Sequence, residues 1–161
     1  MKYFIYVGVC FCLLFIFSCG AGVNSGSEEL SHDSYFMESG HDMRYITSHN
    51  NLHKTILPRV AEYAHNDQFI IAVQLPSFKY QRAIIASELN TGVEEFDSLL
   101  QSADSILLND PYYKKILSRK VNLWIIRNET HELFGPLTVD EYLKKRTELN
   151  IPAELKLDYQ F

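Results

Sequence analysis

Histidine and acidic side chains are the groups in this sequence that could hold a metal ion or assist hydrolysis. The pairs His32-Asp33 and His41-Asp42 are nine residues apart and could meet beside a hairpin, offering nitrogen and oxygen ligands to a divalent ion. Turns also select His and Asp for backbone reasons, and we favour that interpretation. We therefore expect neither a bound metal nor another cofactor, and keep these four residues as candidate ligands only.

The remaining chemical motifs are also incomplete. His49 and His53 have the spacing of a two-ligand helical metal site, but Asn50-Asn51 between them disfavours a helix, so a solvated loop is expected. The sequence contains no Gly-x-Ser-x-Gly motif and no cysteine after Cys19. We predict no catalytic residues and therefore no enzyme. The alternative is an envelope hydrolase or metal-binding enzyme with an unrecognised site.

Four aromatic residues are candidate contacts for a protein or a glycan. Phe78 and Tyr80 fall at an expected turn, and Tyr112 and Tyr113 at an expected helix start. Exposed aromatic rings favour such contacts. Packing in the core is nevertheless the interpretation that we favour for each.

The beginning of the chain predicts where in the cell the protein is located. Residues 3–17 are apolar apart from one glycine and follow Lys2, which is too short for a membrane span and typical of a signal peptide. The run Ile16-Phe17-Ser18-Cys19-Gly20 resembles a bacterial lipobox. That resemblance implies cleavage between Ser18 and Cys19, a signal peptide over residues 1–18, and acylation of the Cys19 thiol. An ordinary secretory signal or an uncleaved anchor is the alternative.

The segment after the cysteine predicts a tether. Residues 19–30 are rich in Gly and Ser, which cannot bury apolar surface. Glu28-Glu29 is interpreted as part of this solvated linker, although an acidic cluster after the cysteine also occurs in outer-membrane lipoproteins. We expect a lipid-anchored location in the bacterial envelope, with the outer membrane favoured over the inner membrane and the leaflet open.

Composition limits the class of protein further. The three cysteines all lie within the first 19 residues, which excludes a disulfide scaffold. The formal charge is -5, and removal of residues 1–18, with Lys2 as their one charged side chain, leaves 14 basic against 20 acidic groups. This acidic balance argues against nucleic-acid binding. Residues 31–161 have the size of a single domain.

Periodicity in residues 31–161 predicts an α+β fold with a small antiparallel sheet. The expected strands cover residues 34–38, 43–48, 57–65, 68–75, 81–88, 121–127 and 132–134, with 155–161 as an edge strand or tail. A helical insertion is expected over about 91–119, where Thr91 and Glu94 have capping-box spacing and Asp110-Pro111 opens a second helix. Thr138 and Glu141 predict a final helix after the strongest hairpin.

The C-terminal part resembles a known group of proteins. It carries a Leu123-Trp124-Ile125-Ile126 strand, a Phe134-Gly135-Pro136 step, and a helix with Lys145-Arg146 near its end. This pattern is similar to that of uncharacterised bacterial lipoproteins, mostly of the Bacteroidetes type, and departs from it at Arg127, where that family has Asp. The resemblance has implications for the fold and the cellular location, but it implies no activity. We expect a non-enzymatic domain that binds an unknown envelope protein or glycan.

Overall fold

The computed structural model describes residues 25–31, 33–40, 42–48, 54–93 and 95–160. It has two antiparallel sheets and four helices, which confirms the α+β class. The first sheet contains β1 (Ser25–Ser31), β2 (Ser34–Ser39) and β3 (Arg44–Ser48). The second contains β4 (Val60–His65), β5 (Phe69–Gln74), β6 (Asn122–Arg127) and β7 (Glu132–Leu137). The helices are α1 (Phe78–Leu89), α2 (Phe96–Asn109), α3 (Pro111–Leu117) and α4 (Val139–Glu148).

The four-stranded sheet, in the order β4-β5-β6-β7, is the central layer of the domain. Its two inner strands are buried on both faces, as their continuous apolar runs predict. Alternate residues along β5 and β6 enter two different hydrophobic clusters. Ile70, Ala72 and Trp124 belong to the cluster that includes the first sheet and the helices α1 to α3. Ile71 and Ile125 belong to the cluster formed with α4 and the C-terminal segment.

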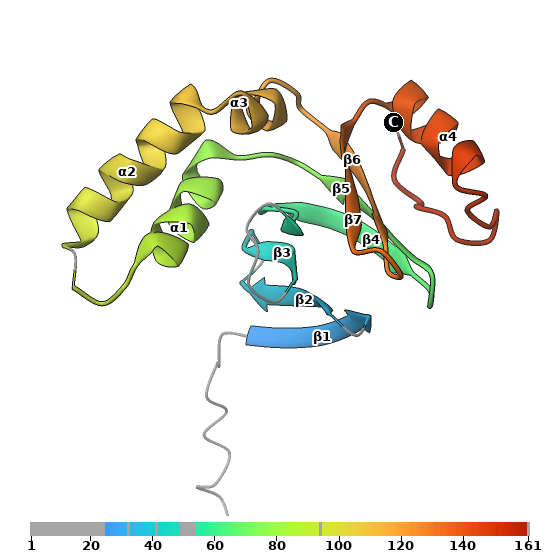
Figure 1. Cartoon of the computed structure of the whole chain (residues 1–161), viewed down its shortest axis with the longest axis horizontal. Coiled ribbons are helices and arrows are strands. Elements are labelled where there is room, and N and C mark those ends of the chain that lie inside the picture. Colours follow the sequence, from blue (N-terminus) through green and yellow to red (C-terminus); the bar gives the residue numbers. More distant parts are fainter. Residues whose placement is uncertain (1–24, 32, 41, 49–53, 94, 161) are drawn as a thin grey trace, which may run out of the picture.

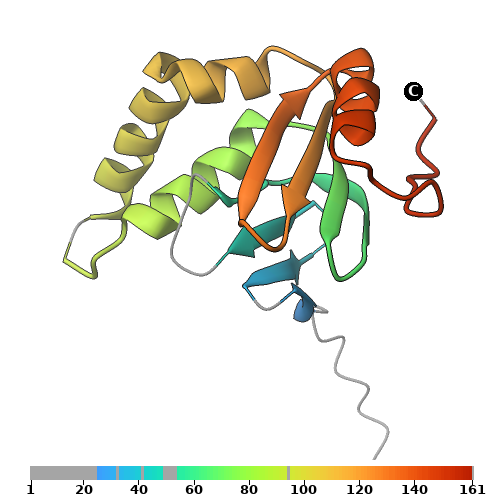
Figure 2. The ribbon, with the colours of Figure 1, turned by 45° about the vertical axis from the view of Figure 1, so that its right-hand side comes forward.

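The pictures show the same layers. The helices α1 and α2 lie side by side on one side of the central sheet, and α4 and the C-terminal tail lie on the other (Figures 1 and 2). The first sheet lies below the central sheet in Figure 1. Among the described residues, no helix combines the length and hydrophobicity that crossing a bilayer requires.

Strand β1 corrects the predicted tether. Residues 25–30 were expected in the flexible linker, but they pair with β2 along its length. Side chains stabilise this strand against β4: the Tyr63 hydroxyl donates to Glu28 Oε2 at 2.5 Å, and His65 Nε2 lies 3.6 Å from Glu28 Oε1. Phe36 of β2 stacks on Tyr63 with ring centroids 4.5 Å apart. Glu28 therefore joins the two sheets and is not part of a solvated linker.

The largest error of the sequence interpretation concerns the residues that form helix α1. Residues 81–88 were predicted as a strand, because a short apolar run does not distinguish strand from helix. In the structure Gln81 and Ile85 lie about one turn apart on α1, and both are buried together with Ala86. The Gln81 amide donates to the Pro58 carbonyl across the core, 3.4 Å away. Packing at helical spacing decides the conformation here.

Helices α2 and α3 follow the predicted order with one shifted boundary. The helix start expected at Thr91 is wrong, since α2 begins at Phe96 with Glu95 as its N-cap residue, and Glu94 lies outside the described residues. Helix α3 starts at Pro111 as predicted, and the Asp110 side chain accepts a hydrogen bond from the Tyr112 backbone N–H at 2.7 Å.

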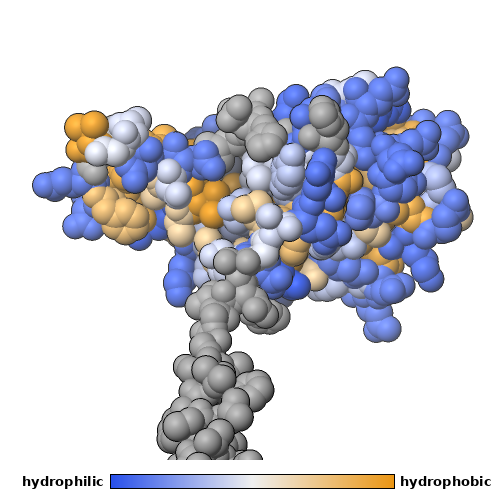
Figure 3. All heavy atoms as spheres, turned by 90° about the horizontal axis from the view of Figure 1, so that it is seen from below, coloured by the Kyte–Doolittle hydropathy of each residue, from blue (hydrophilic) through white to orange (hydrophobic). Residues whose placement is uncertain are grey.

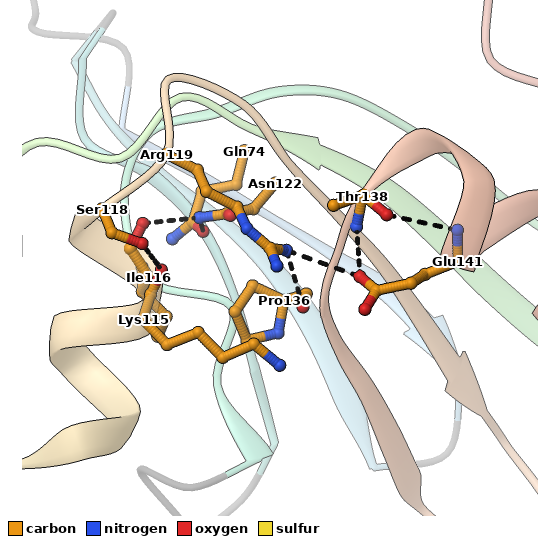
Figure 4. Close-up of polar contacts among 9 residues, drawn as sticks. All are labelled: Gln74, Lys115, Ile116, Ser118, Arg119, Asn122, Pro136, Thr138 and Glu141. Carbon is orange, nitrogen blue, oxygen red and sulfur yellow. Dashed lines mark hydrogen bonds and ion pairs between the residues drawn. The ribbon is translucent and has the colours of Figure 1, made fainter.

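Strand β7 and α4 meet at a compact corner, drawn in Figure 4. The predicted capping box is confirmed: the Thr138 hydroxyl accepts from the Glu141 N–H, and Glu141 accepts from the Thr138 N–H. Arg119 donates to the Pro136 carbonyl at 3.1 Å and lies 3.6 Å from the Glu141 carboxylate. The strand expected over residues 132–134 is longer than predicted, because β7 continues through Pro136 to Leu137. As an edge strand, β7 tolerates a residue without an N–H.

A buried polar network lies behind this corner. Gln74 is fully buried, and its Oε1 atom accepts hydrogen bonds from Trp124 Nε1 at 3.0 Å and Asn122 Nδ2 at 3.1 Å. Asn122 Nδ2 also donates to the Ile116 carbonyl (Figure 4). Gln74 Nε2 donates to the Leu57 carbonyl at 2.7 Å. These bonds tie β5 and β6 to α3 and to the segment before β4, so the network serves the fold.

Residues 155–161 were expected to form an edge strand or a tail. Their described part contains no strand, so it is a tail. Leu155 is buried, and Leu157 and Tyr159 pack against the same cluster as α4. Arg146 donates to the Pro152 carbonyl at 2.9 Å. The tail therefore covers one face of the central sheet.

Candidate ligand groove

A groove of about 840 Å³ lies at the end of the domain where the hairpin turns of the central sheet meet. The β4–β5 and β6–β7 turns lie at the same end because the four strands alternate in direction. The end of β1 and the C-terminal end of α4 complete the walls. The lining side chains are partly apolar and mostly polar: Leu30, Ser31, Asp67, Gln68, Phe69, Arg127, Asn128, Glu129, His131, Leu149 and Asn150. This volume is in the range of small-molecule sites.

Asparagine side chains fix the two turns relative to each other. Asn66 Oδ1 accepts from the backbone N–H groups of Gln68 and Phe69, which closes the β4–β5 turn. Asn128 Nδ2 donates to the Asn66 and Asp67 carbonyls at 3.0 and 3.1 Å. Side chain–backbone hydrogen bonds of Asn66 and Asn128 therefore hold the two turns that line the groove.

One candidate residue of the sequence analysis reaches the groove through a contact with a histidine. Asp33, in the β1–β2 turn, places Oδ2 at 3.1 Å from Nε2 of His131 in the β6–β7 turn. His131 adopts the left-handed conformation, with φ of 52°, which is uncommon for a residue with a side chain. The contact connects the first sheet to the turn end of the second.

The groove presents charges of both signs. Arg127 supplies a guanidinium, and it forms no ion pair with any residue that the structure describes. Asp67 and Glu129 supply carboxylates. Two further atoms of lining residues, Asn128 Oδ1 and Ser31 Oγ, are buried without a hydrogen-bond partner among the described residues. Such atoms are uncommon in folded proteins and indicate capacity for a further polar partner.

The two described residues among the candidate metal ligands, Asp33 and Asp42, do not lie together. His32 and His41 lie outside the described residues, as do His49 and His53. Asp33 and Asp42 lie beyond opposite ends of β2, a strand that spans roughly 17 Å at about 3.3 Å per residue. Asp42 instead contacts Arg59 Nε at 2.7 Å. Within the described ranges, no group of three or more potential ligands could hold a metal ion.

The four candidate aromatics do not form one surface. Phe78 is exposed, and Tyr80 is half-buried and donates to Asp42 Oδ2 at 2.9 Å, a hydrogen bond that raises the pKa of the Tyr80 hydroxyl. Tyr112 is half-buried and contacts Tyr113 edge to face. Tyr113 is not exposed, because this ring lies on the same face of α3 as Ile116 and is buried with it, as core packing requires.

Several groove residues were missed as site residues by the sequence interpretation. The sequence interpretation noted Arg127 only as a departure from a family pattern and gave no role to Asn128 and His131, which lie between two expected strands. A signal was nevertheless present: two polar turns, at 66–67 and 128–131, flank adjacent strands of an antiparallel sheet and must meet at one edge. The contribution of β1 and α4 could be recognised only in three dimensions.

These features define a three-layer α+β domain with a polar groove at the turn edge of its central sheet. The chain belongs to the family described as "Protein of unknown function (DUF3997)", whose model matches residues 33–160. The expectation of an uncharacterised family is thereby confirmed. No curated protein and no solved structure matches the chain.

Proposed function

We propose that this protein is a lipid-anchored lipoprotein of the bacterial cell envelope whose domain binds a small zwitterionic ligand without catalysing a reaction. The observation that carries the proposal is the groove, which combines an Arg127 guanidinium free of ion pairs among the described residues with the carboxylates of Asp67 and Glu129. A free amino acid or short peptide has both complementary charges. Leu30 and Phe69 offer apolar surface for its side chains.

The lipobox-like sequence at Ser18-Cys19 supports the address. Ser25, the first residue of β1, follows Cys19 by six positions, and an extended chain spans at most about 3.6 Å per residue. An acylated Cys19 would keep Ser25 within roughly 22 Å of the membrane surface. Two or three acyl chains give essentially permanent attachment, so the domain would work at the bilayer.

Ligand binding is tested by calorimetry with the dipeptide alanyl-alanine, its form with both termini blocked, and an oligosaccharide of N-acetylglucosamine. The free dipeptide should bind, and the blocked form should bind at least tenfold more weakly. Arg127→Gln should weaken binding to a similar degree. Lys156→Gln is the matched control, since Lys156 is exposed and is not among the residues that line the groove. Equal binding of the blocked dipeptide, binding of the oligosaccharide alone, or no binding at all would contradict the proposed ligand.

Lipid attachment at Cys19 is tested by a separate experiment. Cells that produce the wild type or Cys19→Ala are fed a labelled fatty acid, and the purified chains are compared. The wild type should carry label in the membrane fraction and the variant should carry none. Label in the variant would show that Cys19 is not the anchor, with no consequence for the ligand proposal.

A further inference from the structure

The net negative charge of the chain is concentrated in one segment. Residues 83–113 contain six carboxylates and no Lys, Arg or His, whereas the remaining residues carry 15 basic and 14 acidic groups. This segment is the end of α1, all of α2 and the start of α3. Its acidic residues are Glu88, Glu94, Glu95, Asp97, Asp104 and Asp110. Of these, Asp104 is paired with Arg82, at 2.6 Å from its Nε.

The same segment carries the most exposed apolar side chains in the described part of the chain. Val93, in the loop between α1 and α2, is 89% exposed, and Phe96, the first residue of α2, is 64% exposed. Both begin a series of apolar residues that recurs at three and four positions along this segment. Because α2 begins only at Phe96, burial starts at Leu99 and continues with Ala103 and Leu107. Figure 3 shows orange side chains at the end formed by α1 and α2, while the opposite end is mostly blue.

The tip of the α1–α2 hairpin, which carries Val93 and Phe96, is supported well enough to bind another molecule. The Arg82–Asp104 pair and the buried face of α2 fix the two helices against each other, so Val93 and Phe96 extend from a supported hairpin. Exposed aromatic and aliphatic side chains on a rigid element favour recognition by another macromolecule. Glu88, Glu95 and Asp97 are exposed around them.

We propose that the tip of the α1–α2 hairpin is a docking site for a protein with a basic surface around an apolar pocket. Charge complementarity selects this occupant. A second copy of the chain would bring two acidic hairpins together, and an anionic membrane would repel the same carboxylates. A partner with Lys or Arg around an apolar pocket would instead neutralise Glu88 and Glu95 while it buries Phe96. This proposal requires neither the groove ligand nor the lipid anchor.

The experiment uses the full chain in cells of its source organism, with a photo-crosslinking phenylalanine derivative at position 96. The control places the same derivative at position 143, where Leu143 is 55% exposed on α4. We expect a discrete protein adduct from position 96 only, mapped to a Lys- or Arg-rich region of the partner. Glu88→Lys with Glu95→Lys should reduce that adduct at least tenfold.

A matched charge control separates a specific contact from general attraction. Glu154→Lys with Asp158→Lys makes the same change of net charge at exposed tail positions and should leave the adduct unchanged. Both double variants should retain the wild-type urea midpoint. The proposal is overturned by equal adducts from positions 96 and 143, by an adduct that survives reversal at the hairpin, by a dimer of this chain or a lipid adduct, or by no adduct.

Discussion

Gly135 should be the position where the smallest substitution has the largest structural effect. A Cβ atom there would lie within 2.8 Å of three carbons of the Trp124 ring, and real Cβ atoms do not approach so closely. Trp124 is fully buried and held by its hydrogen bond to Gln74, so the ring has no free space to enter. The backbone φ at Gly135 is +152°, which a residue with a side chain rarely adopts.

The expected magnitude combines two contributions. Overpacking of a well-packed core costs about 1–3 kcal/mol. A backbone conformation reserved for glycine costs about 1–3 kcal/mol more. Gly135→Ala should therefore lower the free energy of unfolding by roughly 2–6 kcal/mol, against a usual total of about 5–15 kcal/mol. With a urea slope of about 2 kcal/mol per molar, the midpoint should fall by about 1–3 M.

Two other glycines separate the contributions. Gly92 has φ of +90° and no atom within 4 Å of an added Cβ, so Gly92→Ala tests backbone strain without a clash. Gly26 has neither feature, and Gly26→Ala should be nearly neutral. Urea unfolding is followed by the fluorescence of the single tryptophan, Trp124. If Gly135→Ala is no less stable than Gly92→Ala, the close approach of glycine and ring has no energetic weight and the reasoning is wrong.

Three more predictions concern polar contacts. Gln74→Leu leaves the Trp124 N–H without its acceptor and should cost about 1–3 kcal/mol per orphaned donor in urea unfolding; an unchanged midpoint would contradict this. Burial, together with the hydrogen bond to Glu28, raises the pKa of Tyr63 to about 12, so the stability contributed by this hydroxyl is complete below pH 10 and is lost as the pH rises toward 12. The melting temperature of Tyr63→Phe should therefore fall less steeply over this pH range than that of the wild type. Equal slopes for the two proteins would refute this prediction. Hydrogen bonds from the Thr138 backbone and side chain lower the pKa of Glu141, so the stability contributed by this carboxylate is present above about pH 4.5 and is lost on acidification. The melting temperature of Glu141→Gln should therefore depend less on pH in the acid range than that of the wild type. Parallel curves of melting temperature against pH would contradict this prediction.

The sequence interpretation succeeded where local signals and packing agree. The continuous apolar runs of β5 and β6 predicted central strands, and the capping box at Thr138 and Glu141 predicted the start of α4. It failed over residues 81–88, because an apolar run of that length suits either a strand or a helix. It also failed over residues 25–30, whose composition suits a tether and which contacts with Tyr63 and His65 stabilise as a strand.

The sequence alone determined the α+β class, the order of most elements and the acidic balance of the chain, because periodicity and capping act over a few residues. It also provided the predicted signal and the candidate anchor at Cys19. Only the tertiary structure decided that Asp33 pairs with His131, that Arg127 lines a groove, and that Phe96 is exposed. Each of these depends on which distant segments pack together, and local patterns carry no record of that packing.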